Sequence, residues 1–480
     1  MYIDKTNKSE DNEMKKIFLF AFVILAINLI YISNVSATIF NCDGSYDDCQ
    51  AKITAASDGD IITLPEGTFN WDSSVSWTNK NIDIIGSGEG ITTITTGHTF
   101  GAFYIIATTK ANFRISNLSI NQGVNGKALW ITNLSGNPTG GTYSPGWRFD
   151  HLEIIANGLT DVRSIYIKGL SYGVIDNVTW SSDYPIANFL THYAQSDNVE
   201  VFGTFGMGTV AWSLNHSLGD NNAIYVEDCT INGSSTGGWA ADVWYGGEVV
   251  FRHNAINRCQ ISTHGARYSA RGGRRIEAYN NSFVASGMND KRVIWWRSGS
   301  GVAFNNTIDS AGSIVVDNQR TCLNMATRCD GINGNAYDMN IDGNGWPCLD
   351  QVGRWQGSPL SQSSEPVYAW HNGTQADCAT DQSTCVDSKH INVNIDFDLC
   401  TSDAPPSLST HLKTIGDASP HTGGVIDYIN NGSTPKPGYA SYTYPHPLRN
   451  QAQYGNITTG GNGSIVISNT GSGRMSVSVY

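Results

Sequence analysis

A short phrase of alternating apolar and polar residues recurs at a nearly constant interval through the middle of the chain. Examples are "FRISNLSI" at 113–120, "GVIDNVTW" at 173–180 and "GVAFNNTI" at 301–308. Successive copies are 34, 26, 52, 25, 27 and 25 residues apart, and the interval of 52 covers two periods. Such a period with short alternating strands is typical of a solenoid, in which each coil is one repeat. The polar marker of each phrase is, in chain order, Asn117, His151, Asn177, Cys229, Asn254, Asn281 and Asn306.

The repeat predicts an all-β, right-handed parallel β-helix with coils of about 25 residues. One coil cannot bury its inward Ile, Val and Phe side chains alone, whereas stacked coils form one continuous apolar column. The marker lies where the chain turns between two strands. Asparagine tolerates left-handed backbone there, and it can hydrogen-bond to its stacked copy. Because Asn117, Asn177, Asn280 and Asn305 also lie in N-x-S/T sequons, glycosylation is the alternative explanation for these asparagines.

The stretch "DGDIITLPEGTFN" at 58–70 has a Gly-Asp pair before an apolar strand and a Pro-x-Gly turn after it. Together with the repeat, it resembles the opening of pectate-lyase-like, right-handed β-helix proteins. The resemblance covers roughly residues 40–320. It implies the fold, but that superfamily contains lyases, hydrolases, adhesins and structural proteins, so the fold alone does not imply an activity.

The repeat fades after Ile314, so we expect the β-helix to span 38–317. Residues 318–450 are rich in Cys, Asp, Asn and Gly, and resemble the tail region of secreted bacterial β-helix proteins. We expect this irregular segment to cap the open sheet edge or a flank of the solenoid. Residues 451–480 are rich in Gly, Ser and Asn, and they predict either a terminal hairpin or a mobile tail.

The first 37 residues have the layout of a secretory signal peptide. Two lysines precede an apolar run from Ile17 to Ile32, and Ser36 and Ala37 suit cleavage after Ala37. The polar residues 1–13 form an extension ahead of it, and a membrane anchor is the alternative. No second apolar segment of that length follows, so we expect an extracellular, monomeric protein with no membrane span after cleavage. The net charge of −13 argues against nucleic acid as a partner.

Ten cysteines in a secreted chain predict disulfides. Three pairs share a spacing that would close a small local loop, and two further pairings are guesses. Zinc is disfavoured because its tighter Cys pairs are absent. The predicted disulfides are Cys42–Cys49, Cys322–Cys329, Cys378–Cys385, Cys229–Cys259 and Cys348–Cys400.

Positive charge is concentrated in one tenth of this acidic chain. Residues 252–297 contain eight of the sixteen arginines, and several of them lie in "HGARYSARGGRR" at 264–275. Three explanations compete: an anion site, a structural role in turns, or chance. In the structural role, the arginines would pair with Glu227, Asp228 and Glu248 of neighbouring coils.

The resemblance to polysaccharide lyases implies a role for this cluster. Positive groups neutralise the carboxylate of a uronate, a base removes the proton at C5, and the leaving oxygen is protonated. His264 is the preferred base, with Arg271 and Lys291 as further catalytic candidates, and the three are expected to converge in an open cleft. Hydrolysis is less favoured because its two placed carboxylates are missing here. The substrate-binding candidates are Arg267, Arg274, Arg275, Arg297, Trp244 and Trp295.

The stretch "DMNIDGNGWPCLD" at 338–350 predicts a calcium-binding loop. Asp338, Asn340, Asp342 and Asn344 alternate as the first ligands of an EF-hand do. Leu349 occupies the position of the bidentate glutamate, so an ordinary Asn/Asp-Gly turn is the alternative.

Two functions are consistent with the sequence. The first is a secreted enzyme that binds an acidic polysaccharide and cleaves it by β-elimination. The second is a non-catalytic surface protein, a rigid rod or adhesin that binds glycans. Burial of the arginines in ion pairs would favour the second function.

Overall fold

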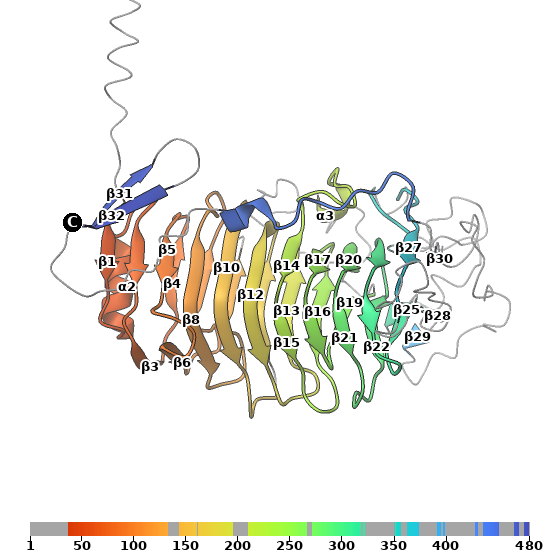
Figure 1. Cartoon of the computed structure of the whole chain (residues 1–480), viewed down its shortest axis with the longest axis horizontal. Coiled ribbons are helices and arrows are strands. Elements are labelled where there is room, and N and C mark those ends of the chain that lie inside the picture. The colour runs from red at the N-terminus through yellow and green to blue at the C-terminus, as the bar shows by residue number, and fades with distance from the viewer. Residues whose placement is uncertain are drawn as a thin grey trace, which may run out of the picture. The chain divides into compact units, whose positions relative to one another are not determined.

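The protein is described by a computed structural model that divides into two compact units (Figure 1). One unit spans Ile39–Gln451, and the other joins Met1–Thr38 to Ala452–Tyr480. In the second unit, β31 (Ile465–Asn469) and β32 (Met475–Val479) form an antiparallel hairpin, one of the two alternatives predicted for the tail. The structure describes residues 37–132, 144–160, 162–194, 210–265, 271–317, 320–321, 350, 352–356, 362–373, 391–394, 397–398, 428–430, 435–450, 465–469 and 475–479.

Parallel strands of the larger unit stack coil on coil into three faces. Faces 1 and 2 belong to one 18-stranded sheet, and face 3 is a 10-stranded sheet. Parallel neighbours joined by a crossover are almost always right-handed. The chain is therefore an all-β, right-handed parallel β-helix, as the repeat predicts.

The bounds of the strands are as follows. Face 1 contains β1 (Ile39–Asn41), β2 (Ile61–Thr63), β5 (Asp83–Ile85), β14 (Ile224–Glu227), β17 (Glu248–Arg252), β20 (Arg275–Tyr279), β23 (Ser300–Phe304), β27 (Val367–Trp370) and β30 (Tyr428–Asn430). Face 2 contains β3 (Gly67–Trp71), β6 (Thr92–Thr96), β15 (Thr230–Asn232), β18 (Ala255–Asn257), β21 (Ser282–Val284) and β24 (Thr307–Ile308). The long strands β8 (Arg114–Gln122), β10 (Ser144–Ile155) and β12 (Ser171–Ser181) run through both faces.

Face 3 contains β4 (Val75–Thr78), β7 (Phe103–Ile106), β9 (Leu129–Thr132), β11 (Arg163–Lys168), β13 (Asn188–Tyr193), β16 (Trp239–Trp244), β19 (Gln260–Thr263), β22 (Arg292–Trp296), β25 (Ser313–Asp317) and β28 (Ile391–Asn394). Strands from beyond residue 317 thus join the sheets, since β27 pairs with β23 and β28 with β25. The pair β26 (Arg320–Thr321) and β29 (Phe397–Asp398) forms a separate small sheet.

Alternation places every second side chain of a strand inside the solenoid, as the period-2 pattern predicts. One column of face 1 runs through Ile115, Phe149, Ile175, Val226 and Phe251, which pair in register and are fully buried. Burying one such side chain contributes about 1.5–3 kcal/mol. No single coil could collect this column, so stacking and core formation are one event.

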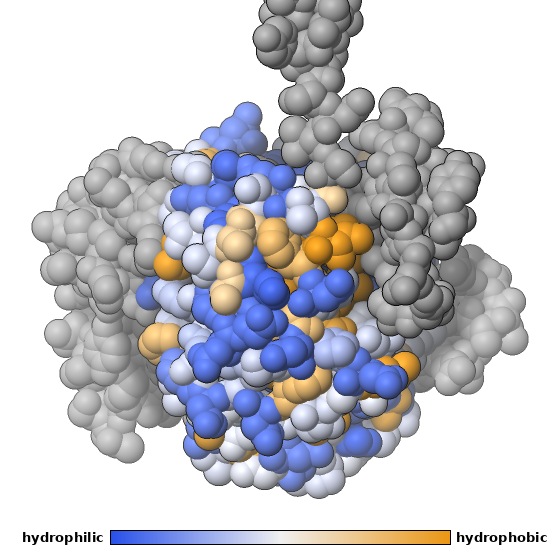
Figure 2. Space-filling model, turned by 90° about the vertical axis from the view of Figure 1, so that its left-hand side faces the viewer, coloured by the Kyte–Doolittle hydropathy of each residue, from blue (hydrophilic) through white to orange (hydrophobic). Residues whose placement is uncertain are grey.

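The end of the solenoid beside β1 is covered by α2 (Tyr46–Ala55). Ser45 caps this helix by accepting a hydrogen bond from the Asp48 amide, and Cys49 and Ile53 face the core. This end faces the viewer in Figure 2, where hydrophilic side chains surround a smaller apolar patch. The helix therefore closes this end of the apolar column.

The corner between faces 1 and 2 contains two columns of polar residues rather than one. Asn254, Asn281, Asn306 and Asn372 form a buried ladder in which each side-chain amide donates to the next oxygen at 2.8–3.0 Å. The residues just before them have positive φ and line the outer edge of the corner. The predicted marker mixes the two columns. Its members Asn117, His151 and Asn177 belong to the outer column, and Cys229, Asn254, Asn281 and Asn306 belong to the buried one.

The cysteines confirm one predicted disulfide and contradict another. Cys42 and Cys49 are bonded, within one short loop. Cys229 and Cys259 are both free and buried, because Cys229 lies at the corner between β14 and β15 while Cys259 lies at the next corner, between β18 and β19. The other three predicted pairs lie outside the described residues. Among the described residues, no helix is long and apolar enough to cross a membrane.

Candidate functional site

The predicted substrate-binding arginines Arg274 and Arg275 lie on face 1 and are fully buried. Arg275 pairs with Glu277 at 2.6 Å and with Asp220 at 2.7 Å. Arg274 donates to the carbonyl oxygen of Leu214 at 2.8 Å and stacks on a tryptophan ring. Charges that are buried and paired in this way hold chain segments together. The prediction that these arginines bind a sugar is therefore wrong, and the structural alternative describes them.

Arg271, a predicted catalytic residue, is also held in a buried ion pair. Its guanidinium donates twice to the Asp350 carboxylate, at 2.7 and 2.6 Å, and both side chains are buried. A bidentate pair of this kind fixes geometry as well as charge. Arg271 therefore anchors the segment around residue 350 to the solenoid, which is a different role from the one predicted.

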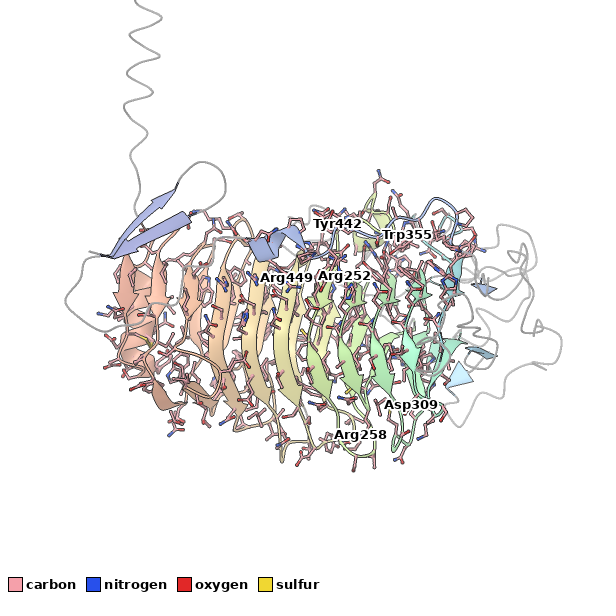
Figure 3. All side chains as sticks on the ribbon, viewed as in Figure 1. Arg252, Arg258, Asp309, Trp355, Tyr442 and Arg449 are labelled. Carbon is pink, nitrogen blue, oxygen red and sulfur yellow. A yellow bond between two sulfur atoms is a disulfide. The ribbon has the colours of Figure 1, made fainter. Side chains whose placement is uncertain are left out.

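Face 1 is covered by residues 435–450, which we call the strap (Figure 3). Arg449 of the strap, in the 3-10 turn η4 (Pro447–Asn450), pairs with Glu227 at 3.0 Å and with Asp176 at 3.2 Å. Tyr439 donates to Glu277 at 2.6 Å. A second cover is the stretch around α3 (Val210–Ser213), whose carbonyl groups accept from Arg274. Face 1 from β10 to β27, which includes Arg274 and Arg275, is thus an internal surface.

The predicted catalytic residues do not converge. His264 follows the last residue of β19, whereas Lys291 precedes the first residue of β22. These strands are neighbours with Thr263 opposite Trp296, so the two side chains lie at opposite ends of the pair, about 20 Å apart along the strand direction. The Lys291 ammonium donates to the carbonyl oxygen of Ala285. The expected three-residue cleft is therefore wrong.

Two sets of predicted residues lie outside the described part of the chain. These are Arg267 and the calcium-loop residues Asp338, Asn340, Asp342 and Asn344. The calcium site stays a prediction. Within the described residues, no group of three or more His, Cys, Asp or Glu side chains is arranged to hold a metal ion.

The remaining predicted residues meet on the outward side of face 3. The rings of Trp244 and His264 stack with centroids 3.2 Å apart, and the Trp244 indole donates to Asp242 at 2.7 Å. Arg297 lies 4.1 Å from the centroid of Trp295 and pairs with Asp242 at 3.4 Å. Four of the predicted residues thus form one cluster on the third strands of consecutive coils.

This cluster is one end of a longer line of rings, which we call the aromatic row. Adjacent rings in the row have centroids 3.2–5.8 Å apart and come from β7, β9, β11, β13 and β16, with one ring just before β7 and one just after β19. Offset and edge contacts of this kind stabilise aromatic pairs. The members of the row are Phe100, Tyr104, Trp130, Tyr166, Tyr193, Trp244 and His264.

Cations lie against several aromatic rings on the outward side of face 3. The Lys127 ammonium is 4.7 Å from the Trp130 centroid and 5.4 Å from that of Tyr166. Outside the row, Arg292 lies 3.3 Å from the centroid of Trp295, and its guanidinium is paired with the Asp290 carboxylate. Cations over ring faces are attracted by the quadrupole of the ring.

Access to the aromatic row is graded along its length. Phe100 is 42% exposed, which is unusual for a phenylalanine, and Tyr104, Trp130 and Tyr193 are half-buried. Tyr166 and Trp244 are nearly buried by their neighbours. Burial raises the pKa of Tyr104, so its hydroxyl stays protonated and can donate a hydrogen bond. The surface thus offers flat apolar rings, a donor and adjacent cations.

Sequence reasoning finds only Trp244 and His264 of the aromatic row. A usable signal was present, since "FYII", "LWIT" and "IYIK" place Tyr104, Trp130 and Tyr166 at the same strand position in consecutive coils. The repeated phrase covers only the strands of faces 1 and 2, so it does not include the third strand of each coil.

No protein-family model and no curated protein sequence matches the chain. Solved structures with a similar course of the chain include a pectin methylesterase mutant in complex with a hexasaccharide (12% identity, 55% of this chain, 93% of that chain, TM-score 0.34). They also include an alginate lyase from Paenibacillus sp. (14%, 58% and 97%, 0.29) and an alginate lyase of the PL6 family (12%, 83% and 54%, 0.33). At these identities and scores the likenesses do not bear on activity, and the class of this protein, a parallel β-helix, rests on its own strand pairing.

Proposed function

We propose that the protein binds an acidic polysaccharide along the outward side of face 3. The observation that carries this proposal is the unbroken aromatic row across six consecutive coils, with the Lys127 ammonium against two of its rings. Flat rings bind the apolar faces of sugar rings, and a guanidinium binds a carboxylate or sulfate with two parallel hydrogen bonds. The Cys42–Cys49 disulfide supports an oxidising, extracellular location for this activity.

Phe100 and Lys127 provide the first test, because both are accessible at one end of the aromatic row. Phe100→Ala and Lys127→Met are each expected to weaken binding roughly tenfold, as loss of one anchor costs upward of about 1 kcal/mol. The measurement is calorimetric titration with pectate, alginate and chondroitin sulfate at two salt concentrations. Binding through Lys127 should weaken as salt rises.

Matched controls come from exposed residues away from face 3. Ile91→Ala removes a side chain that is 51% exposed, before β6, and Lys52→Met removes a lysine of α2. Both should bind like the wild type. If none of the three polysaccharides binds, or if the controls lose as much affinity as the test variants, face 3 is not the binding surface.

Cleavage by β-elimination is the second candidate, and it is favoured by the position of His264. The pairing of Thr263 with Trp296 makes His264 and Arg297 neighbours on adjacent coils. In this mechanism Arg297 neutralises a uronate carboxylate, and His264 accepts the proton from C5. The bond from C4 to the glycosidic oxygen then breaks, a C4–C5 double bond forms, and the leaving oxygen takes up a proton.

A rise in ultraviolet absorbance from unsaturated uronides would reveal this reaction. We expect the wild-type rise to be lost in His264→Gln and retained in His253→Gln, a histidine of the corner between faces 1 and 2. Assays with and without calcium test the predicted loop at 338–350 at the same time. Binding without any rise in absorbance would leave the non-catalytic rod as the function.

A further inference from the structure

Between the two ends of the aromatic row, face 3 carries polar atoms that have no hydrogen-bond partner among the described residues. The buried oxygen or nitrogen atoms concerned are Asn188 Oδ1, Thr191 Oγ1, Gln260 Oε1 and Trp130 Nε1. Thr191 is 1% exposed and Gln260 is 5% exposed. A buried polar group without a partner costs about 1–3 kcal/mol, so each such atom calls for an explanation.

The strand register gathers these atoms into one strip. Asn188 lies beside Arg163 and Trp239 on the neighbouring coils, and Trp239 is followed by Gln260. Thr191 lies in the next outward column, between Tyr166 and Asp242. We call Asn188, Thr191 and Gln260 the polar strip. It lies between two clusters on face 3. The first consists of Lys127, Trp130 and Tyr166, and the second of Arg292, Trp295 and Arg297.

The distance between the two clusters sets a minimum length for a ligand that touches both. β9 and β22 are separated by five neighbour steps, through β11, β13, β16 and β19. At 4.7–4.9 Å per step the span is about 24 Å, which is too long for one or two sugar rings. A polymer that spans it must pass over the polar strip.

We infer that one acidic polysaccharide chain occupies both clusters at once, and that the polar strip binds the hydroxyl groups of the sugar units between them. Amide oxygens accept hydrogen bonds from hydroxyls, and the Thr191 hydroxyl both donates and accepts. This inference rests on the proposed function and deepens it: the ligand is a long chain with free hydroxyls, and short oligosaccharides are poor ligands. Linking two contacts through one chain raises affinity on the order of 10²-fold or more without a new contact.

The test uses the full chain and sized oligosaccharides prepared from whichever of pectate, alginate and chondroitin sulfate binds most tightly. Wild-type affinity should rise in two stages, first as one cluster is filled and again when the oligosaccharide reaches both. Trp130→Phe and Trp295→Phe keep a ring in place and report each cluster separately. A single smooth plateau for the wild type would overturn the inference while leaving polysaccharide binding, and hence the proposed function, intact.

Thr191→Val separates ligand binding from a structural role, because valine has the same shape and lacks the unpaired hydroxyl. It should weaken long oligosaccharides roughly three- to tenfold, leave short ones unchanged, and leave the melting temperature equal or higher. Thr95→Val on face 2 is the matched control and should change neither affinity. Equal losses for short and long oligosaccharides, or no loss for long ones, would overturn the role of the polar strip.

Discussion

Replacing Arg252 by methionine is expected to lower the free energy of unfolding by about 3–5 kcal/mol, the usual cost of breaking a buried ion pair. Arg252 is fully buried on β17, where its guanidinium donates to Glu227 at 2.8 Å and to the Tyr279 hydroxyl at 3.0 Å. It also donates to the carbonyl oxygens of Tyr442 and Thr443 in the strap. Methionine fills part of the space but leaves the buried Glu227 carboxylate with only its contacts to the strap, and it removes the hydrogen bonds to the two strap carbonyl groups. Urea unfolding monitored by tryptophan fluorescence measures the effect.

Arg258→Met is the matched control, at a corner remote from the strap (Figure 3). Its half-buried guanidinium donates to the carbonyl oxygen of Ser234 at 3.0 Å, so only about 0.5–1.5 kcal/mol should be lost. The strap of the Arg252 variant should also become sensitive to protease. A loss below about 1 kcal/mol in Arg252→Met would mean that the strap contributes little to stability and that Glu227 finds other partners.

The architecture can be predicted from the sequence because the coils of a solenoid share one alternating pattern of apolar and polar residues. Every coil restates the same alternation, so most coils can be recognised from their neighbours. The interval of 52 residues was the exception: the prediction that it covers two periods is wrong, because β12 pairs directly with β14 and β15 and the interval belongs to one coil. The corner shows the limit of that reasoning. His253 and Asn254 are adjacent polar residues, and only backbone φ separates the outer column from the buried ladder.

The structural role of the arginine-rich stretch depends on a feature that no local pattern reveals. Whether an outward side chain of a solenoid meets water depends on what covers that face. Arg275 meets Asp220, and Arg252 meets Tyr442, some 190 residues away in the chain. An arginine buried by a distant segment and an arginine exposed in a binding groove have the same local sequence. The alternation alone therefore predicts the face but not its cover.

The aromatic row could have been predicted, since its register is a property of the repeat. What the sequence could not supply is the absence of partners for Asn188, Thr191 and Gln260, which depends on atomic positions across three coils. The aromatic row and the polar strip also differ in their effect on the stability of the unliganded protein. Rings that contact one another stabilise the free protein, whereas unpaired polar atoms destabilise it. The strip is therefore the stronger pointer to a ligand.

The strap should loosen in acid because of His446. This imidazole is buried against the ring of Tyr225, with centroids 4.8 Å apart, and the cations Arg252 and Arg449 lie near it. Burial, followed by repulsion from the two arginines, lowers the pKa of His446 from 6.5 to about 3. The folded protein therefore keeps His446 neutral over a range of pH in which the unfolded chain binds a proton.

The sign of the effect follows from proton binding. Between pH 6.5 and about 3 the unfolded state holds one more proton at this site than the folded state, so the stability contributed by neutral His446 is complete above pH 6.5 and is lost as the pH falls. The loss is about 1.4 kcal/mol per pH unit. At pH 4.5 the wild type should have lost about 2.7 kcal/mol relative to pH 7 from this residue alone.

Because other groups titrate in the same range, the measurement compares the wild type with His446→Gln. Asp83, for example, has a pKa raised to about 6 by burial and adds stability as the pH falls. Glutamine keeps a polar side chain and cannot be protonated, so the difference between the two unfolding free energies isolates His446. That difference should change by about 1.4 kcal/mol for each pH unit between 6 and 4. A difference independent of pH would show that acid does not act on the strap through His446, and that water reaches the imidazole in the folded state.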